Sequence, residues 1–160
     1  MRINGSLRFN LWLLVAGLVA MAGSTASVAD AAVVTKLKAQ LIWGTDGEKP
    51  SENTCKELNE PLKKKLCRVF KWKNYFEISQ QSVVLAGETK RLKMSAKCEV
   101  EVRSLDDSTL EIKLFGEGKW TKTVRQSLKA LNKGEIAVIA GDAKDNINDA
   151  WFVVFSVPHD

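Results

Sequence analysis

Residues 91–115, RLKMSAKCEVEVRSLDDSTLEIKLF, contain two segments in which apolar and polar residues alternate. In the first segment every second residue from Leu92 to Val102 is apolar or a small residue, and mostly charged residues fill the positions between them. The second segment repeats this pattern from Leu110 to Leu114. A period of two is typical of a strand with one buried face. The stretch therefore predicts a β-hairpin with one apolar and one charged face.

The register of this hairpin follows from its two faces, because opposed residues of an antiparallel pair lie on the same face. Pairing Val102 with Leu110 satisfies this rule and leaves a three-residue loop, 105–107, in which Asp107 takes the left-handed conformation. Each large apolar side chain contributes about 1.5–3 kcal/mol when it is fully buried. A second layer must therefore cover the apolar face.

Residues 60–70 change to helical spacing. Leu62 and Val69 belong to an apolar stripe, and Pro61 suits the first turn of a helix. An earlier start at TCKE, 54–57, matches a capping box but would place the proline in the helix interior. We expect one helix at about 60–70, with an extra preceding turn as the alternative.

Short strands are expected along the rest of the chain, with few helical segments between them. They fall at 34–43, 76–78, 83–85, 119–126, 136–140 and 151–155, with a polar turn at 79–81 and a possible helical turn at 124–131. The last run, WFVVF, is apolar enough to be buried on both faces. The fold class expected is mainly β, an antiparallel β-sandwich or partly open barrel of seven or eight strands with one α-helix inserted after the first strand.

The N-terminus has the three regions of a secretory signal peptide. Two arginines and no acidic residue occur in the first ten positions, an apolar run LWLLVAGLVAM occupies 11–21, and small residues follow. The apolar run is shorter than the ~20 residues of a membrane-spanning helix. We therefore expect a cleaved signal peptide at 1–31 and no transmembrane anchor after cleavage.

Cleavage after ADA at 29–31 would leave a single β-rich domain at 32–160, and AMA at 20–22 is the alternative site. The predicted mature chain loses two arginines and one aspartate, which leaves 22 basic and 18 acidic residues and a net charge of +4. Its length suits one domain with its own core.

Three cysteines remain in the predicted mature chain, and an exported compartment permits disulfides. Cys98 lies on the apolar strand face, where a free thiol behaves as a small apolar side chain. We therefore expect a disulfide between Cys55 and Cys67. A bridge between Cys67 and Cys98 and three free thiols are the alternatives.

Residue types that carry catalysis or bind metals are sparse, and no catalytic, metal or cofactor site is predicted. The only histidine, His159, is one residue from the end of the chain, and the cysteine spacing matches no zinc site. The aspartate-rich loop 141–149 does not have the spacing of an EF-hand, which favours a polar turn over a calcium site. Glu99 and Glu101 could imitate a glycosidase pair, but their position beside cations on a solvated strand favours surface charge.

The positive charge of the chain is concentrated between residues 56 and 73. Seven cations and two glutamates give this segment a net charge of +5, while the remainder of the predicted mature chain carries −1. A solvated helix face would account for the lysines; a binding surface for an anionic partner is the functional interpretation. The residues expected at that site are Lys63, Lys64, Lys65, Arg68, Lys71, Trp72 and Lys73.

The expected partner is an anionic envelope polymer or an acidic protein, and export makes nucleic acid the least suitable target. Trp43 and Trp151 are expected in the core, whereas Trp72 and Trp120 have lysine neighbours and are expected to be partly exposed, which makes a weak case for stacking on sugars.

We expect a small non-catalytic binding or structural accessory protein of the cell envelope, secreted or periplasmic. The alternative is a small hydrolase of envelope polymers, which requires two carboxylates converging in a cleft with at least one of them desolvated.

Overall fold

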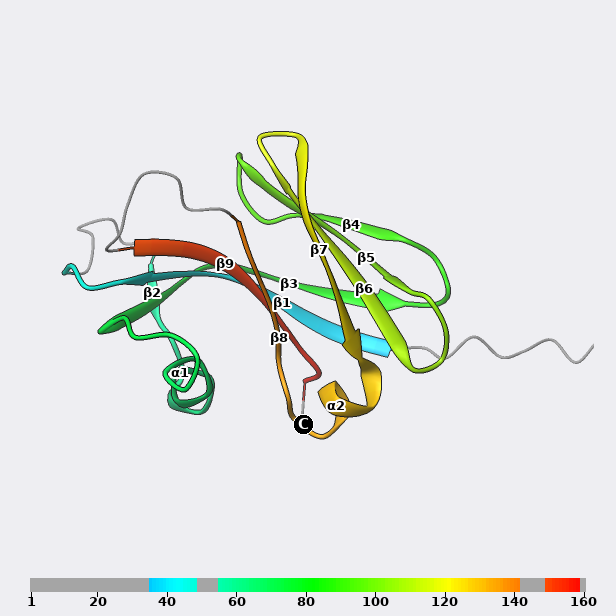
Figure 1. The fold of residues 1–160 in the computed structure, drawn as a ribbon, viewed down its shortest axis with the longest axis horizontal. Helices are drawn as coiled ribbons and strands as arrows, with labels where there is room; N and C mark the ends of the chain where they lie inside the picture. Colours follow the sequence, from blue (N-terminus) through cyan, green and yellow to red (C-terminus); the bar gives the residue numbers. More distant parts are fainter. Residues whose placement is uncertain (1–34, 49–54, 142–148, 159–160) are drawn as a thin grey trace, which may run out of the picture. The chain divides into compact units, whose positions relative to one another are not determined.

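Two antiparallel β-sheets packed face to face form the body of the protein (Figure 1). The computed structural model describes residues 35–48, 55–141 and 149–158. The predicted signal peptide and its cleavage site lie outside these residues. The mainly β class and the antiparallel sandwich predicted from the sequence are confirmed.

Sheet A has five strands and sheet B has four. In spatial order, sheet A consists of β2 (Lys56–Glu57), β3 (Asn74–Leu85), β1 (Thr35–Thr45), β9 (Asp149–Ser156) and β8 (Ala137–Ala140). Sheet B is a meander of β4 (Lys90–Lys93), β5 (Cys98–Ser104), β6 (Thr109–Gly116) and β7 (Lys119–Ser127). The two-residue β2 was not predicted.

Two helices accompany the sheets, rather than the single helix expected. Helix α1 (Glu60–Leu66) lies between β2 and β3 in the chain, and α2 (Leu128–Asn132) joins β7 to β8. The Ser127 side chain accepts a hydrogen bond from the Ala130 amide and caps α2. Neither of these described helices is long and apolar enough to span a membrane.

The hairpin of β5 and β6 is confirmed, but its predicted first arm from Leu92 to Val102 is divided between β4 and β5, which pair with each other across a turn at 94–97, and the predicted register was wrong by two residues. Val102 pairs with Ile112 rather than with Leu110. The same apolar residues still point inward, because a shift of two positions returns each side chain to its original face.

The hairpin turn causes this shift, since it is centred one residue later than expected. Leu105 and Thr109 close a loop of Asp106, Asp107 and Ser108, with 2.9 Å between the Leu105 amide nitrogen and the Thr109 carbonyl oxygen. The Asp106 carboxylate accepts hydrogen bonds from the Ser108 amide and hydroxyl, both at 2.7 Å. Among the described non-glycine residues only Glu117 has a positive φ, so the left-handed conformation expected for Asp107 is also wrong.

The polar stretch expected as a turn at 79–81 lies within the continuous strand β3. Ser79 donates a hydrogen bond to the Met94 carbonyl oxygen at 2.6 Å, and Gln81 donates one to the Lys93 carbonyl oxygen at 2.5 Å. These side chains therefore link the edges of the two sheets. The turn prediction was wrong because their polar groups find partners inside the fold.

The main core lies between the two sheets and is closed at one end by α2. It contains Leu37, Leu41, Leu85, Val100, Val102, Leu110, Ile112, Leu131, Ile139, Val153 and Phe155. Leu128 and Leu131 of α2 contribute two of its side chains.

A second core lies between sheet A and α1, on the side of sheet A that faces away from sheet B (Figure 1). It contains Ile42, Leu58, Leu62, Leu66, Tyr75, Phe152 and Val154. Phe152 and Val154 of β9 enter this core, while Val153 and Phe155 enter the main core. The prediction that the last strand is buried on both faces is therefore confirmed.

Gly44 allows the Trp72 ring to pack directly on β1. A Cβ at this position would lie 2.5 Å from Cε3 of Trp72, closer than any ordinary contact. The ring cannot move away easily, because it stacks on Phe70 and Phe152 with centroid distances of 5.1 and 5.8 Å. The close approach of the loop after α1 thus requires glycine in β1.

Replacing Gly44 with alanine is expected to lower the free energy of unfolding by about 1–3 kcal/mol, the usual cost of overpacking a well-filled site. Urea unfolding at pH 7 measures this change. As a control, the same substitution is made in a Trp72→Leu background, where the obstructing ring is absent. The glycine substitution should cost less there; an equal cost in both backgrounds would show that the ring contact is not its cause.

Candidate functional site

Helix α1 presents its lysines to solvent because its apolar side is fixed on sheet A. The Asn59 side chain accepts a hydrogen bond from the Leu62 amide at 3.1 Å and caps the helix, and Pro61 occupies the first turn. Leu62 and Leu66, one turn apart, are both buried in the second core. The residues between them must point sideways or outward.

The helix ends at Leu66, earlier than the predicted end near residue 70. The amides of Val69 and Phe70 both donate to the Leu66 carbonyl oxygen, at 2.9 and 2.8 Å, so the chain turns there. Val69 is consequently 69% exposed instead of belonging to the apolar stripe. Phe70 turns back toward Phe152, with 5.0 Å between the ring centroids.

The loop that follows α1 is held against β1 and β3. The Tyr75 hydroxyl donates a hydrogen bond to the Phe70 carbonyl oxygen at 3.2 Å, and burial raises the pKa of Tyr75 to about 12. The Lys73 amide donates to the Asp46 carboxylate at 3.0 Å. These contacts fix the loop while its lysine side chains stay on the outside.

We define the basic surface as the six cations of α1 and its loop. Lys64, Arg68, Lys71 and Lys73 are exposed, and Lys63 and Lys65 are half-buried. Among the residues that the structure describes, none of these six cations has a carboxylate oxygen within the 4.0 Å limit of an ion pair. Within the described part of the chain, the structure thus brings the predicted cations together on one side of the protein and pairs none of them with a carboxylate.

Lys65 connects this surface to the turn between α2 and β8. Its ammonium group donates a hydrogen bond to the Gly134 carbonyl oxygen. A shallow hollow of about 400 Å³ lies at this junction, lined by Lys65, Arg68, Val69, Lys133, Gly134, Glu135 and Ile136. Three cations, one carboxylate and two apolar side chains therefore surround a depression that reaches from α1 to the α2–β8 turn.

Sequence reasoning missed Lys133 and Gly134 as parts of this hollow. The charge pattern ended at Lys73, and a possible helical turn at 124–131 was the only structure expected near Lys133. No sequence signal places Gly134 beside Lys65, 69 positions away, because the contact depends on how β8 returns along sheet A.

Trp72, which was expected at the binding site, packs within a cluster of aromatic rings. Besides stacking on Phe70 and Phe152, it meets Tyr75 edge to face at 6.3 Å between ring centroids. It supports the loop that carries Lys71 and Lys73.

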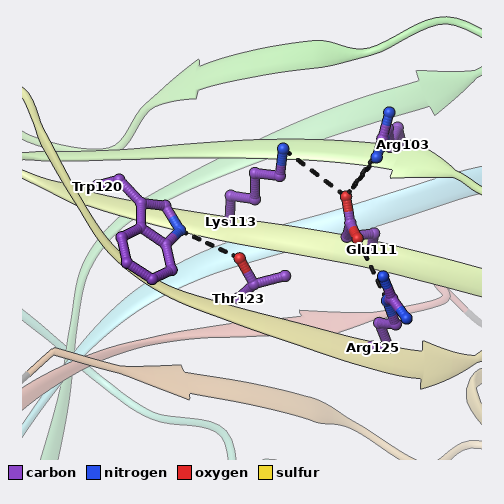
Figure 2. Close-up of polar contacts among 6 residues, drawn as sticks. All are labelled: Arg103, Glu111, Lys113, Trp120, Thr123 and Arg125. Carbon is purple, nitrogen blue, oxygen red and sulfur yellow. Dashed lines mark hydrogen bonds and ion pairs between the residues drawn. The ribbon is translucent and has the colours of Figure 1, made fainter.

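The other tryptophans are distributed over separate parts of the fold. Trp120 is 62% exposed on the outer face of sheet B, and its indole donates a hydrogen bond to the Thr123 hydroxyl at 3.1 Å (Figure 2). Trp43 is half-buried and Trp151 is 49% exposed, and neither belongs to the two buried cores. The core positions expected for both were therefore wrong. Trp72 and Trp120 do not lie together as a sugar-stacking pair would.

Several cations of sheet B differ from those of the basic surface, because each has a carboxylate within ion-pair distance. Figure 2 shows Glu111 between Arg103 and Arg125, with nitrogen to oxygen distances of 2.7 and 3.2 Å, and Lys113 at 3.8 Å. Hydrogen bonds from Arg103 and then from Arg125 lower the pKa of Glu111, against the opposing effect of desolvation.

Glu99 and Glu101, the carboxylates considered for a hydrolase, lie on the same outer face. Arg91 binds both of them, at 2.7 and 3.1 Å, and its guanidinium group lies over the Phe115 ring at 4.5 Å from the centroid. They are therefore engaged in surface ion pairs and do not converge in a cleft.

The expected disulfide between Cys55 and Cys67 is not formed in the structure, where Cys55, Cys67 and Cys98 are all free thiols. Cys55 is buried just before β2, whereas Cys67 is exposed at the end of α1 and interacts with the Tyr75 hydroxyl. Cys98 is half-buried against the main core, close to the apolar position expected for it.

Two remaining candidates from the sequence fall largely outside the described residues. His159 and most of the aspartate-rich loop, 142–148, are not described. Within the described ranges, no group of three or more His, Cys, Asp and Glu side chains is placed to hold a metal ion.

Comparison of the chain with known protein families, with curated proteins and with solved structures found no match. The site is therefore interpreted from its own geometry and charge.

Replacing Glu111 with glutamine is expected to destabilise the protein at pH 7 and to have much less effect in acid. Because the folded-state pKa lies below the ordinary value of 4.5, the ionised carboxylate stabilises the fold above that pH, and this contribution is lost as pH falls through the lowered value. Melting temperatures of wild type and E111Q at pH 7 and pH 3 measure the difference.

Asp107→Asn is the control for this measurement, because Asp107 is an exposed carboxylate in the β5–β6 turn. It should leave the melting temperature nearly unchanged at pH 7. A gap between wild type and E111Q that stays constant from pH 7 to pH 3 would contradict the assigned role of Glu111.

Proposed function

We propose that this protein is an exported, non-catalytic binding or accessory protein of the cell envelope that holds an anionic partner on its basic surface. The observation that carries the proposal is the contrast between two sets of cations. The arginines of sheet B, Arg91, Arg103 and Arg125, are paired with glutamates, whereas the six cations of α1 and its loop lie close together in the chain and have no carboxylate within ion-pair distance among the described residues.

Unpaired cations on one surface favour association with a polyanion. Each lysine or arginine near an anionic surface contributes about 1 kcal/mol at physiological salt, and salt screens the attraction over about 8 Å. A cluster of six such side chains would therefore bind measurably, even though each single contact is weak.

The spread of the cations supports a partner with repeated negative charges. They extend from Lys63 in the middle of α1 to Lys73 in the loop, and Lys133 continues the surface at the α2–β8 turn. An acidic envelope polysaccharide offers charges at regular intervals along such a path. An acidic protein segment is the second candidate, and exposed Val69 beside the hollow would suit its apolar side chains.

The hydrolase alternative has less support. It requires a desolvated carboxylate with a raised pKa beside a second carboxylate. Of the described carboxylates, Glu111 is the buried one, and its ion pairs lower its pKa. Such an ionised group is suited to holding strands together and not to donating a proton.

The triple variant Lys64→Glu, Arg68→Glu, Lys71→Glu tests the basic surface. We expect it to elute from immobilised heparin, used as an acidic polysaccharide probe, at clearly lower salt than wild type, because three attractive charges become repulsive. The unfolding free energy should change by no more than about 0.5 kcal/mol per site, since all three residues are exposed. A polyglutamate resin tests the acidic-protein alternative.

A matched control reverses three exposed lysines elsewhere, Lys36→Glu, Lys93→Glu and Lys119→Glu. It changes the net charge by the same amount at positions spread over β1, β4 and β7. Elution of both triple variants at the same salt concentration would show that only net charge matters and would remove the proposal.

Export is tested by expressing the full chain in a Gram-negative host and measuring the intact mass of the protein from the periplasmic fraction. We expect a chain that begins at Ala32, because small residues occupy the two positions that signal peptidase reads. Changing Ala29 and Ala31 to arginine should block this cleavage. An uncleaved chain confined to the cytoplasm would contradict the proposal.

A further inference from the structure

A cavity of about 590 Å³ lies between the two sheets, at the end of the sandwich away from α2. Figure 1 shows the β4–β5 turn and the β6–β7 hairpin at this end. Leu41 and Val153 of sheet A line one wall of the cavity, and Cys98 and Leu114 of sheet B line the other. The volume falls within the roughly 300–1,000 Å³ typical of small-molecule sites.

The cavity continues into an apolar platform on sheet A. Trp43 lies two residues after Leu41 in β1, and Trp151 lies two residues before Val153 in β9. Alternate residues of a strand point to the same side, so both tryptophans lie on the face that Leu41 and Val153 occupy. Their rings stack at 5.7 Å with 15° between the planes, and Trp151 remains 49% exposed. Large aromatic side chains on the inner face of a sandwich are normally covered, so their exposure marks a place where sheet B does not reach.

Polar groups are confined to the rim. The Ser95 hydroxyl accepts hydrogen bonds from the Lys97 and Cys98 amides at 3.2 and 3.1 Å and shapes the β4–β5 turn. The Lys97 ammonium group lies 3.4 Å from a Glu117 carboxylate oxygen, and both side chains are more than 70% exposed. An exposed pair of this kind contributes only about 0–1 kcal/mol, so a ligand carboxylate can replace Glu117 at little cost.

We propose that this cavity binds a free single-chain hydrocarbon carboxylate, with the chain between the sheets and the carboxylate at Lys97. The walls belong to two different sheets, so an occupant has to enter between the layers. A flexible chain one carbon wide can do so, whereas a folded protein surface cannot. Lys97 at the rim is the one charged side chain in the described lining of the cavity. This arrangement matches a ligand that has an apolar body and one anionic end.

Cys98 provides a reporter inside the cavity. It is a free thiol that lines the wall, and burial raises its pKa to about 11. Cys67 is exposed on the other side of sheet A, at the end of α1, and serves as an internal reference for thiol reactivity.

Gly141 offers a way to fill the cavity without straining the backbone. A Cβ at this position would meet Cδ2 of Leu114 at 3.7 Å, an ordinary contact, and Gly141 lines the cavity. Gly141→Leu should therefore place a side chain where the ligand would lie. Ala86→Leu adds the same side chain at an exposed turn and is the matched control.

The experiment titrates the purified protein with dodecanoate below its micelle concentration and follows tryptophan emission. We expect saturable binding, weakened about tenfold or more by Gly141→Leu and unchanged by Ala86→Leu, because burying a hydrocarbon chain dominates the affinity. Lys97→Gln should weaken dodecanoate by about two- to fivefold and leave dodecanol unchanged. No saturable binding by wild type, or equal binding by the Gly141 variant, overturns the proposal.

Thiol alkylation gives a second measurement that needs no variant. Saturating dodecanoate should slow the reaction of Cys98 with N-ethylmaleimide, read by peptide mass, and leave the rate at Cys67 unchanged. Equal rates at Cys98 with and without dodecanoate overturn the proposal, as does binding only to phospholipid vesicles and not to the free acid.

The outcome is independent of the basic surface, because the charge-reversed variant of Lys64, Arg68 and Lys71 should bind dodecanoate like wild type. Loss of dodecanoate binding in that variant would assign the binding to the basic surface and would contradict the cavity site.

Discussion

The structure depends on burying both faces of sheet A. In β1 and β9 neighbouring apolar residues point to opposite sides, so that Leu41 and Val153 face sheet B while Ile42 and Phe152 face α1. A central strand of this kind leaves a large apolar area in water unless layers cover it from two directions. Sheet B and α1 are those layers, and each accounts for one candidate site.

The two covering layers differ in how they meet sheet A. Helix α1 is capped by Asn59 and packs Leu62 and Leu66 on the sheet. Its cations therefore point sideways or outward. Sheet B covers the opposite face incompletely, and the cavity beside Leu114 and the exposed Trp151 ring are the result. A polar surface and an apolar cavity therefore arise from the same requirement for coverage.

The alternation of apolar residues was sufficient to predict the strands and the sandwich, because burial on one face imposes a period of two. It was not sufficient for the register of β5 and β6, since pairing Val102 with Leu110 or with Ile112 buries the same side chains. The hydrogen bonds of the Asp106 carboxylate decided between the two. Likewise, Ser79 within β3 looked like part of a turn, because its partner, the Met94 carbonyl oxygen just after β4, lies fifteen positions further along the chain.

By itself the sequence determined the fold class, the position of α1 and the concentration of charge between residues 56 and 73, because these depend on patterns among near neighbours. Only the tertiary structure decided which cations are paired, that Cys55 and Cys67 remain free, and that Lys133 lies beside α1. Those properties depend on distances between segments far apart in the chain. The cavity had no sequence signature, since it is the space that sheet B leaves uncovered.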